Sequence, residues 1–115
     1  MNKRVKKKWL KALRSGEYVQ GRGALCQVGG DYDTFCYLGV LTDLYLLEKG
    51  EGWDARPGEG YLRFGDWYAA LPPSVSEWAG LATSDPQLGA ASGTAWNDKM
   101  GASFSKIADM IEEEL

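Results

Sequence analysis

The stretch Tyr18–Leu47, with the sequence YVQGRGALCQVGGDYDTFCYLGVLTDLYLL, is the part of the chain around which we expect the rest to fold. Its first half alternates polar and apolar residues between glycines, which is typical of short strands. The turn-forming segment 29–31 follows, and if residues 34–36 return as a strand, the two arms form a hairpin. From about Phe35 the apolar residues follow the spacing of a helix that is apolar on most sides, which favours a central, buried position.

Two amphipathic helices are expected to flank this unit, one on each side in the sequence. In residues 3–14, Val5, Trp9 and Leu13 recur every four residues and form one apolar stripe, while lysines fill the other face. In residues 103–115 the apolar residues again recur every three or four positions. Because both stripes need an apolar surface to cover them, we expect these helices to pack near each other.

The remaining segments indicate a mixed architecture. Ser74 and Glu77 have the spacing of a capping box ahead of a short helix whose buried face would contain Val75 and Trp78. Segments 50–60 and 83–94 are rich in glycine and other turn-forming residues, so we expect loops there. The sequence predicts a single α+β domain over residues 1–115, with about four helices near 3–14, 35–48, 74–80 and 103–115, packed around a small antiparallel sheet or hairpin from 18–28 and 61–65.

Four single residues carry finer predictions about helix ends and helix packing. Asp33 or Thr34 can cap the start of the central helix, and Ser103 can cap the start of the last one. Gly39 lies inside the central helix, where glycine costs about 1 kcal/mol relative to alanine. A glycine kept at such a position indicates close packing against another backbone.

Composition places the chain among folded globular proteins. The 115 residues are 44% apolar and 12% aromatic, which suits one domain with a real core. No apolar run approaches the roughly 20 residues needed to cross a bilayer. The basic N-terminal residues lack the continuous apolar segment of a secretory signal. Two cysteines, Cys26 and Cys36, are most simply read as reduced core residues, so we expect a cytoplasmic protein and no membrane contact.

The net charge of −3 conceals a strong asymmetry along the chain. Residues 1–14 hold seven cations and no acid, whereas the other residues hold six cations and 16 acids, a balance of −10. A basic arm on an acidic body suggests contact with nucleic acid. The alternative is pairing with the acidic segment 112–114, within one chain or between the chains of a homodimer. The candidate nucleic-acid contacts are Lys3, Arg4, Lys7, Lys8, Lys11 and Arg14.

The residue types present make binding a better prediction than catalysis. The chain has no histidine, which is the commonest general base and the commonest metal ligand. It has no phosphate-binding P-loop and no Gly-x-Ser-x-Gly nucleophile motif. Cys36 near a helix start and the pair Asp31 and Asp33 are explained more simply by core packing and by a solvated turn. We therefore predict no catalytic residues, no metal and no cofactor.

Aromatic and arginine residues supply candidates for a binding site. Five tryptophans and six tyrosines exceed what a core of this size needs, so some rings should be partly exposed. Exposed rings can stack a nucleotide base or hold a peptide, and arginines can bind phosphate. The alternative for each ring is a structural role in a small core. The candidate ligand-binding residues are Gln20, Arg22, Arg63, Trp67, Trp96 and Asn97.

Four blocks of sequence, in this order, resemble a known family. The blocks are WLKALRSGEYVQG (9–21), CYLGVLTDL (36–44), LPPSVSEW (71–78) and NDKMGASFSKIADMIE (97–112). They are similar to a family of short uncharacterised proteins encoded in tailed-phage and prophage genomes. The family often has a second cysteine where this chain has Phe35, which weakens the idea of a paired-thiol function. The resemblance implies an accessory protein in the cytoplasm of a host cell that binds a host protein or a nucleotide-like ligand and counteracts host defence.

Overall fold

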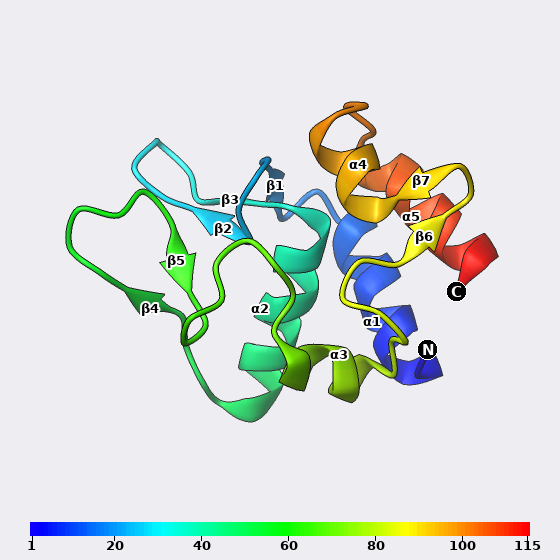
Figure 1. The fold of residues 1–115 in the computed structure, drawn as a ribbon, viewed down its shortest axis with the longest axis horizontal. Coiled ribbons are helices and arrows are strands. Elements are labelled where there is room, and N and C mark those ends of the chain that lie inside the picture. Colours follow the sequence, from blue (N-terminus) through cyan, green and yellow to red (C-terminus); the bar gives the residue numbers. More distant parts are fainter.

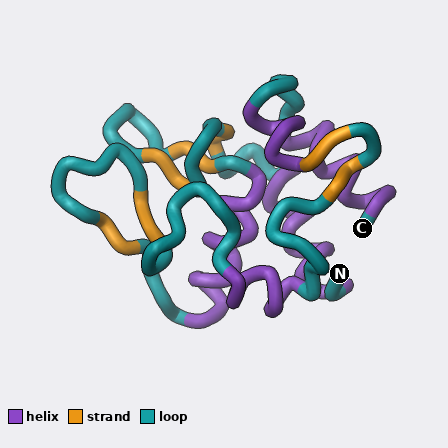
Figure 2. Tube along the Cα trace, viewed as in Figure 1, coloured by secondary structure: helices purple, strands orange, loops and turns teal.

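The computed structural model describes all 115 residues and places helix α2 (Tyr37–Lys49) between the other helices and the small sheets (Figure 1). Figure 2 shows how much of the chain runs in loops between very short strands. The other elements, in chain order, are α1 (Lys3–Arg14), β1 (Val19–Gln20), β2 (Cys26–Gln27), β3 (Thr34–Phe35), β4 (Asp54–Ala55), β5 (Leu62–Arg63), α3 (Pro73–Ala79), β6 (Gln87–Leu88), β7 (Ala91–Ser92), α4 (Gly93–Asp98) and α5 (Phe104–Glu114). The predicted α+β class is confirmed.

Helix α2 is the most buried helix, as its apolar spacing predicted. Helices α1, α3 and α4 contact it, and the apolar stripes of α1 and α5 pack against each other, as expected. None of the five helices combines the length and the apolar character needed to cross a membrane. The core shared with α2 consists of Val5, Trp9 and Leu13 from α1, Val75 and Ala79 from α3, Phe104, Ile107, Ala108 and Ile111 from α5, and Leu25, Leu71 and Leu88 from connecting segments and β6.

The strands pair differently from the predicted arrangement. Strands β2 and β3 form the expected antiparallel hairpin, but β1 pairs with β3 in parallel, so the sheet order is β1-β3-β2. Strand β5 lies where the 61–65 strand was expected, but its partner is β4, inside the segment predicted to be irregular. A single bridge between Gln27 and Tyr61 links the two sheets. Strands of two residues are too short to leave a recognisable pattern in the sequence. Their pairing depends on which other segment lies beside them in the fold.

Three further features differ from the predictions. Segment 83–94, expected to be loop, contains the β6-β7 hairpin and the start of helix α4, whose N-cap Ser92 accepts a hydrogen bond from the Ala95 N–H. The capping box expected from Ser74 and Glu77 does not form: helix α3 begins at Pro73 without a side-chain cap, and proline suits the first helical position. Cys36, not Asp33 or Thr34, caps α2: its Sγ accepts a hydrogen bond from the Gly39 N–H at 3.4 Å. Ser103 caps α5 as predicted.

Gly39 is where α2 approaches another backbone most closely. A Cβ atom built at this position would lie 1.7 Å from the carbonyl oxygen of Leu25, far inside contact distance. The predicted reason for a glycine within this helix is therefore confirmed, and the absence of a side chain lets α2 lie directly against the chain next to β2.

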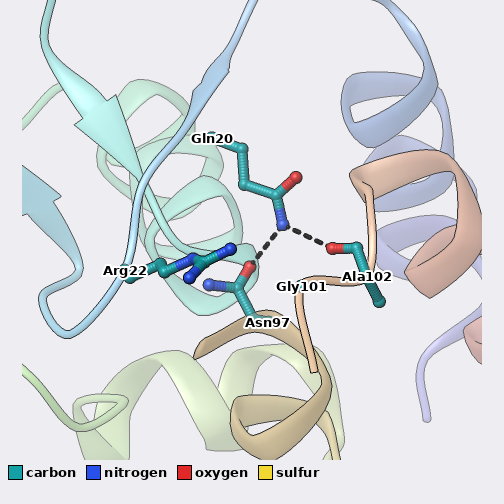
Figure 3. Close-up of a pocket in the computed structure, with 5 residues that line it drawn as sticks. All are labelled: Gln20, Arg22, Asn97, Gly101 and Ala102. Carbon is teal, nitrogen blue, oxygen red and sulfur yellow. Dashed lines mark hydrogen bonds between the residues drawn. The ribbon is translucent and has the colours of Figure 1, made fainter. Parts of the chain in front are cut away.

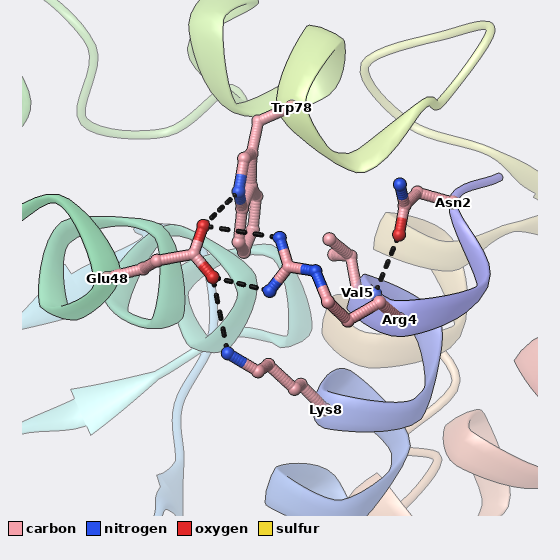
Figure 4. A network of polar contacts seen from close by, with 6 residues as sticks. All are labelled: Asn2, Arg4, Val5, Lys8, Glu48 and Trp78. Atoms are coloured by element: carbon pink, nitrogen blue, oxygen red, sulfur yellow. Dashed lines mark hydrogen bonds and ion pairs between the residues drawn. The ribbon is translucent and has the colours of Figure 1, made fainter.

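The cations of α1 make ion pairs on two sides of that helix. On one side Arg4 and Lys8 bind the carboxylate of Glu48, which also accepts a hydrogen bond of 2.6 Å from the indole N–H of Trp78 (Figure 4). On the other side Arg14 pairs with α5, its Nη2 lying 2.8 Å from Asp109 and 3.1 Å from Glu112. Of these acids, only Glu112 belongs to the segment 112–114 that the charge pattern offered as a partner for the basic helix.

Replacing Gly39 with alanine is expected to destabilise the protein, although alanine is the better helix former. The added methyl group must displace the Leu25 backbone, and overpacking of this kind costs about 1–3 kcal/mol or more. Urea unfolding followed by circular dichroism measures the difference. Gly52→Ala is the matched control, since no atom lies within 4 Å of a Cβ at that position. Equal stability of Gly39→Ala and the natural protein would contradict the packing described here.

The Glu48 carboxylate is expected to make the free energy of unfolding depend on pH in the acid range. Hydrogen bonds, first from Arg4 and then from Trp78, lower the pKa of Glu48 from its ordinary 4.5 to about 2. Because the folded pKa is the lower one, the stabilisation is complete above about pH 4.5 and is lost as the pH falls toward 2. Glu48→Gln should have a lower melting temperature near neutral pH and a smaller further decrease in acid. Glu51→Gln, at an exposed glutamate without an ion pair, should follow the natural protein instead.

Candidate functional site

A small polar hollow lies where β1 meets the connection between α4 and α5 (Figure 3). Its volume is about 130 Å³. Three of the six candidate ligand-binding residues, Gln20, Arg22 and Asn97, line it together with Gly101 and Ala102. Segments almost 80 positions apart in the sequence, 20–22 and 97–102, are therefore brought together at one site.

Asn97 holds the walls of the hollow together. It is 1% exposed, and its Oδ1 accepts hydrogen bonds from the Gln20 side chain at 2.9 Å and from the Tyr37 N–H at 3.3 Å. Its Nδ2 donates to the carbonyl oxygen of Gly21 and to a carboxylate oxygen of Asp98. Every donor and acceptor of this side chain has a partner in the protein, so Asn97 positions the site and does not offer a free group to a ligand.

Gln20 closes the hollow on the side of α5. Its Nε2 donates to Asn97 and, at 2.8 Å, to the carbonyl oxygen of Ala102. Its Oε1 accepts no hydrogen bond within the protein. An unused carbonyl oxygen can accept a hydrogen bond from a ligand or from a water molecule that bridges to one.

Arg22 is the charged residue of the hollow. Its side chain is exposed, makes no ion pair or hydrogen bond within the chain, and extends toward Asn97 (Figure 3). The two flanking glycines explain its position. A Cβ at Gly21 would lie 2.4 Å from the Thr34 hydroxyl oxygen, and Gly23 has a φ of +80° that turns the chain away. The backbone is thus held against β3 on one side of Arg22 and reversed on the other.

The size and chemistry of the hollow suit the anionic group of a ligand. At about 30 Å³ per water molecule, 130 Å³ corresponds to about four waters, which is well below the size of a pocket for a whole drug-sized ligand. A guanidinium without a counter-charge binds phosphate or carboxylate oxygens, in a two-bond geometry where access allows. The lining could therefore hold one anionic group, with the rest of the ligand outside.

The other three candidate ligand residues lie elsewhere. Arg63 forms two hydrogen bonds with Glu59, at 2.8 and 2.9 Å, and its guanidinium stacks over the rings of Tyr61 and Tyr68. Trp96 is partly buried and donates its indole N–H to the Leu88 carbonyl oxygen. Trp67 lies at a different surface, beside α3. The lining residues that sequence reasoning missed, Gly101 and Ala102, carry no chemical signal because neither has a polar side chain.

The six candidate nucleic-acid contacts divide into two groups. Arg4, Lys8 and Arg14 are engaged in the ion pairs with Glu48, Asp109 and Glu112. Lys3, Lys7 and Lys11 are exposed and have no partner in the chain. They border an open hollow of about 470 Å³, which Leu10 and Glu112 also line.

The groups considered for catalysis lie in unreactive surroundings. Burial raises the pKa of the Cys36 thiol to about 11 and that of Cys26 to about 12, and a thiol must ionise to act as a nucleophile. Asp31 and Asp33 lie on the exposed turn between β2 and β3. Nowhere do three or more cysteine, aspartate or glutamate side chains gather closely enough to hold a metal ion.

Comparison with known proteins gives one match. Searches of curated proteins and of solved structures found no similar protein. The whole sequence, residues 1–115, matches the protein family described as Domain of unknown function (DUF8296). With a match of that extent, the chain belongs to the DUF8296 family.

Proposed function

We propose that this protein acts by binding and not by catalysis, and that its ligand is a nucleotide-like molecule whose anionic group enters the hollow beside Arg22. The observation that carries the proposal is a guanidinium without a counter-charge at the mouth of a polar hollow that Gln20 and Asn97 keep in shape. The other arginine among the candidate ligand residues, Arg63, already has Glu59 as its partner. The resemblance to tailed-phage proteins suggests the setting, which is the cytoplasm of a host cell where the protein counteracts host defence.

Melting temperatures in the presence of anions test this proposal. A ligand at ten times its dissociation constant stabilises the folded state by about 1.4 kcal/mol. For a domain of this size that raises the melting temperature by about 5 °C. We expect such a rise with at least one member of a panel of inorganic phosphate, nucleoside phosphates, cyclic dinucleotides and ADP-ribose, measured against chloride at the same ionic strength. Arg22→Gln should abolish the rise, because it removes the only cation of the hollow.

Arg56→Gln provides the control for the loss of one positive charge. Arg56 is exposed, lies 3.9 Å from Asp66, and does not line the hollow. The rise in melting temperature should survive this change. A shift that Arg22→Gln retains, or that both variants lose equally, would show that anions bind elsewhere, and the absence of any shift would refute the nucleotide-like ligand.

A second candidate function is contact with the phosphate backbone of nucleic acid through Lys3, Lys7 and Lys11. These lysines follow one another at four-residue spacing, which places them on one face of α1 about 6 Å apart along the helix. Each neighbouring pair repels by about 0.2–0.5 kcal/mol, and no acid of the chain pairs with them. An anionic backbone would relieve this repulsion. No aromatic side chain is exposed on α1, which favours binding without preference for base sequence.

The salt dependence of binding tests the second candidate. With three phosphate contacts, the logarithm of the affinity for a labelled single strand should fall with the logarithm of salt concentration with a slope of about −2. Lys7→Gln should reduce that slope by about 0.7 and slightly raise the melting temperature, because it removes two repulsions. Lys99→Gln, an exposed lysine outside α1, should change neither quantity. Flat salt dependence, or no binding at low salt, would exclude this function.

A further inference from the structure

The five tryptophans differ in whether the indole N–H has a partner. Four of them donate a hydrogen bond within the chain, and Trp67 donates none. Trp67 also has 40% of its surface exposed. Tryptophan normally finds a partner for its N–H when it serves the core. The four partnered residues are Trp9 with the Tyr37 carbonyl, Trp53 with Asp43, Trp78 with Glu48, and Trp96 with the Leu88 carbonyl.

The backbone holds Trp67 in place on both sides. Its N–H and C=O both bond to Phe64, at 3.0 and 2.8 Å, across the two-residue turn 65–66. The next carbonyl, that of Tyr68, accepts a hydrogen bond of 2.7 Å from the Leu25 N–H, which ties the segment to the core. An aromatic side chain mounted on a rigid backbone loses little conformational freedom when a partner binds.

Trp67 forms one wall of an open groove of about 430 Å³ against α3. The other apolar side chains of the groove are those of Leu71, Pro73, Leu81 and Ala82. Ser76 also lines it, and the Oγ of Ser76 is the one buried side-chain polar atom of the chain without a hydrogen-bond partner. The groove thus combines apolar walls with one buried hydroxyl, that of Ser76, that has no hydrogen-bond partner within the protein.

Two acidic residues lie at the groove. Glu77 lines it, and Asp66, next to Trp67 in the turn, has a side chain that is 99% exposed. The nearest cation to Asp66 is Arg56, whose Nη2 lies 3.9 Å away. Outside residues 1–14 the chain has an excess of ten negative charges, which attracts positively charged partners over longer distances.

We propose that the groove between Trp67 and α3 docks a segment of another protein, in which an apolar side chain enters the groove while neighbouring lysines or arginines face Asp66 and Glu77. Tryptophan is among the residues that contribute most to binding at protein interfaces, usually from a packed pocket with a polar surround. The inference does not depend on the anion hollow, because the two sites share no residue.

Peptide selection on the full chain tests this inference. Short random peptides are displayed, selected for binding, and the recovered sequences are then synthesised with a fluorescent label for anisotropy measurements. We expect recovered peptides to carry an apolar residue flanked by lysine or arginine. Trp67→Ala should weaken their binding by about thirtyfold, as expected for a central tryptophan, and Glu77→Lys should weaken it by reversing a charge at the groove.

Two controls separate this result from unfolding and from the anion site. Tyr32→Ala removes another exposed ring, 71% exposed on the turn between β2 and β3, and should leave peptide binding unchanged. Arg22→Gln should also bind the peptide normally, whatever its response to anions. Circular dichroism and melting temperature verify that Trp67→Ala is folded, and Trp67→Phe, which keeps a ring but lacks the indole N–H, should give an intermediate affinity.

Four outcomes would overturn the inference. One is that selection recovers no peptide, and another is that recovered peptides bind Trp67→Ala as tightly as the natural protein. A third is that the recovered peptides are acidic or lack an apolar residue. The last is a concentration-dependent increase in mass that Trp67→Ala removes, since it would identify a second copy of this chain as the occupant of the groove.

Discussion

The close contact between Gly39 and the carbonyl group of Leu25 is the constraint on which the rest of the structure depends. It lets the most apolar helix lie directly on the chain beside β2, so that the sheet and the helices share one core. Tyr37, the first residue of that helix, then meets three other parts of the chain. Its N–H bonds to Asn97, its carbonyl accepts from Trp9, and its hydroxyl donates to Asp85. The polar hollow exists because Asn97 is held at this junction.

Most residues that could have served binding are used to hold the fold together. Four indole N–H groups and the carboxylate of Glu48 connect α1, α2, α3 and the surrounding loops, and the guanidinium of Arg63 is enclosed by Glu59 and two tyrosine rings. Few of these aromatic and charged side chains lack a partner within the chain. Three different surfaces carry the exceptions, which are Arg22, the lysines Lys3, Lys7 and Lys11 of α1, and Trp67. Each surface suits a different kind of partner.

Particular residues show which structural features can be predicted from the local sequence and which cannot. The helices over 3–14 and 103–115 were predicted because their apolar spacing is regular over three turns, and Gly39 was understood because a glycine within a helix has few explanations. Helix α4 and the β6-β7 hairpin were missed because six-residue and two-residue elements leave almost no periodic pattern. Of the candidate ligand residues, only those on segments 20–22 and 97–102 meet, and no spacing in the sequence indicates that these two segments adjoin.

By itself the sequence determined the α+β class, the most buried helix, the two amphipathic helices that pack against each other, and the separation of a basic first helix from an acidic remainder. These follow from periodicity and composition, which neighbouring residues set. Only the tertiary structure decided which strands pair, which cations have no ion-pair partner, and which tryptophan N–H has no hydrogen-bond partner. Each of those depends on a partner far along the chain, such as Glu48 for Arg4 or Leu88 for Trp96, and the presence of a partner is a property of the packed molecule.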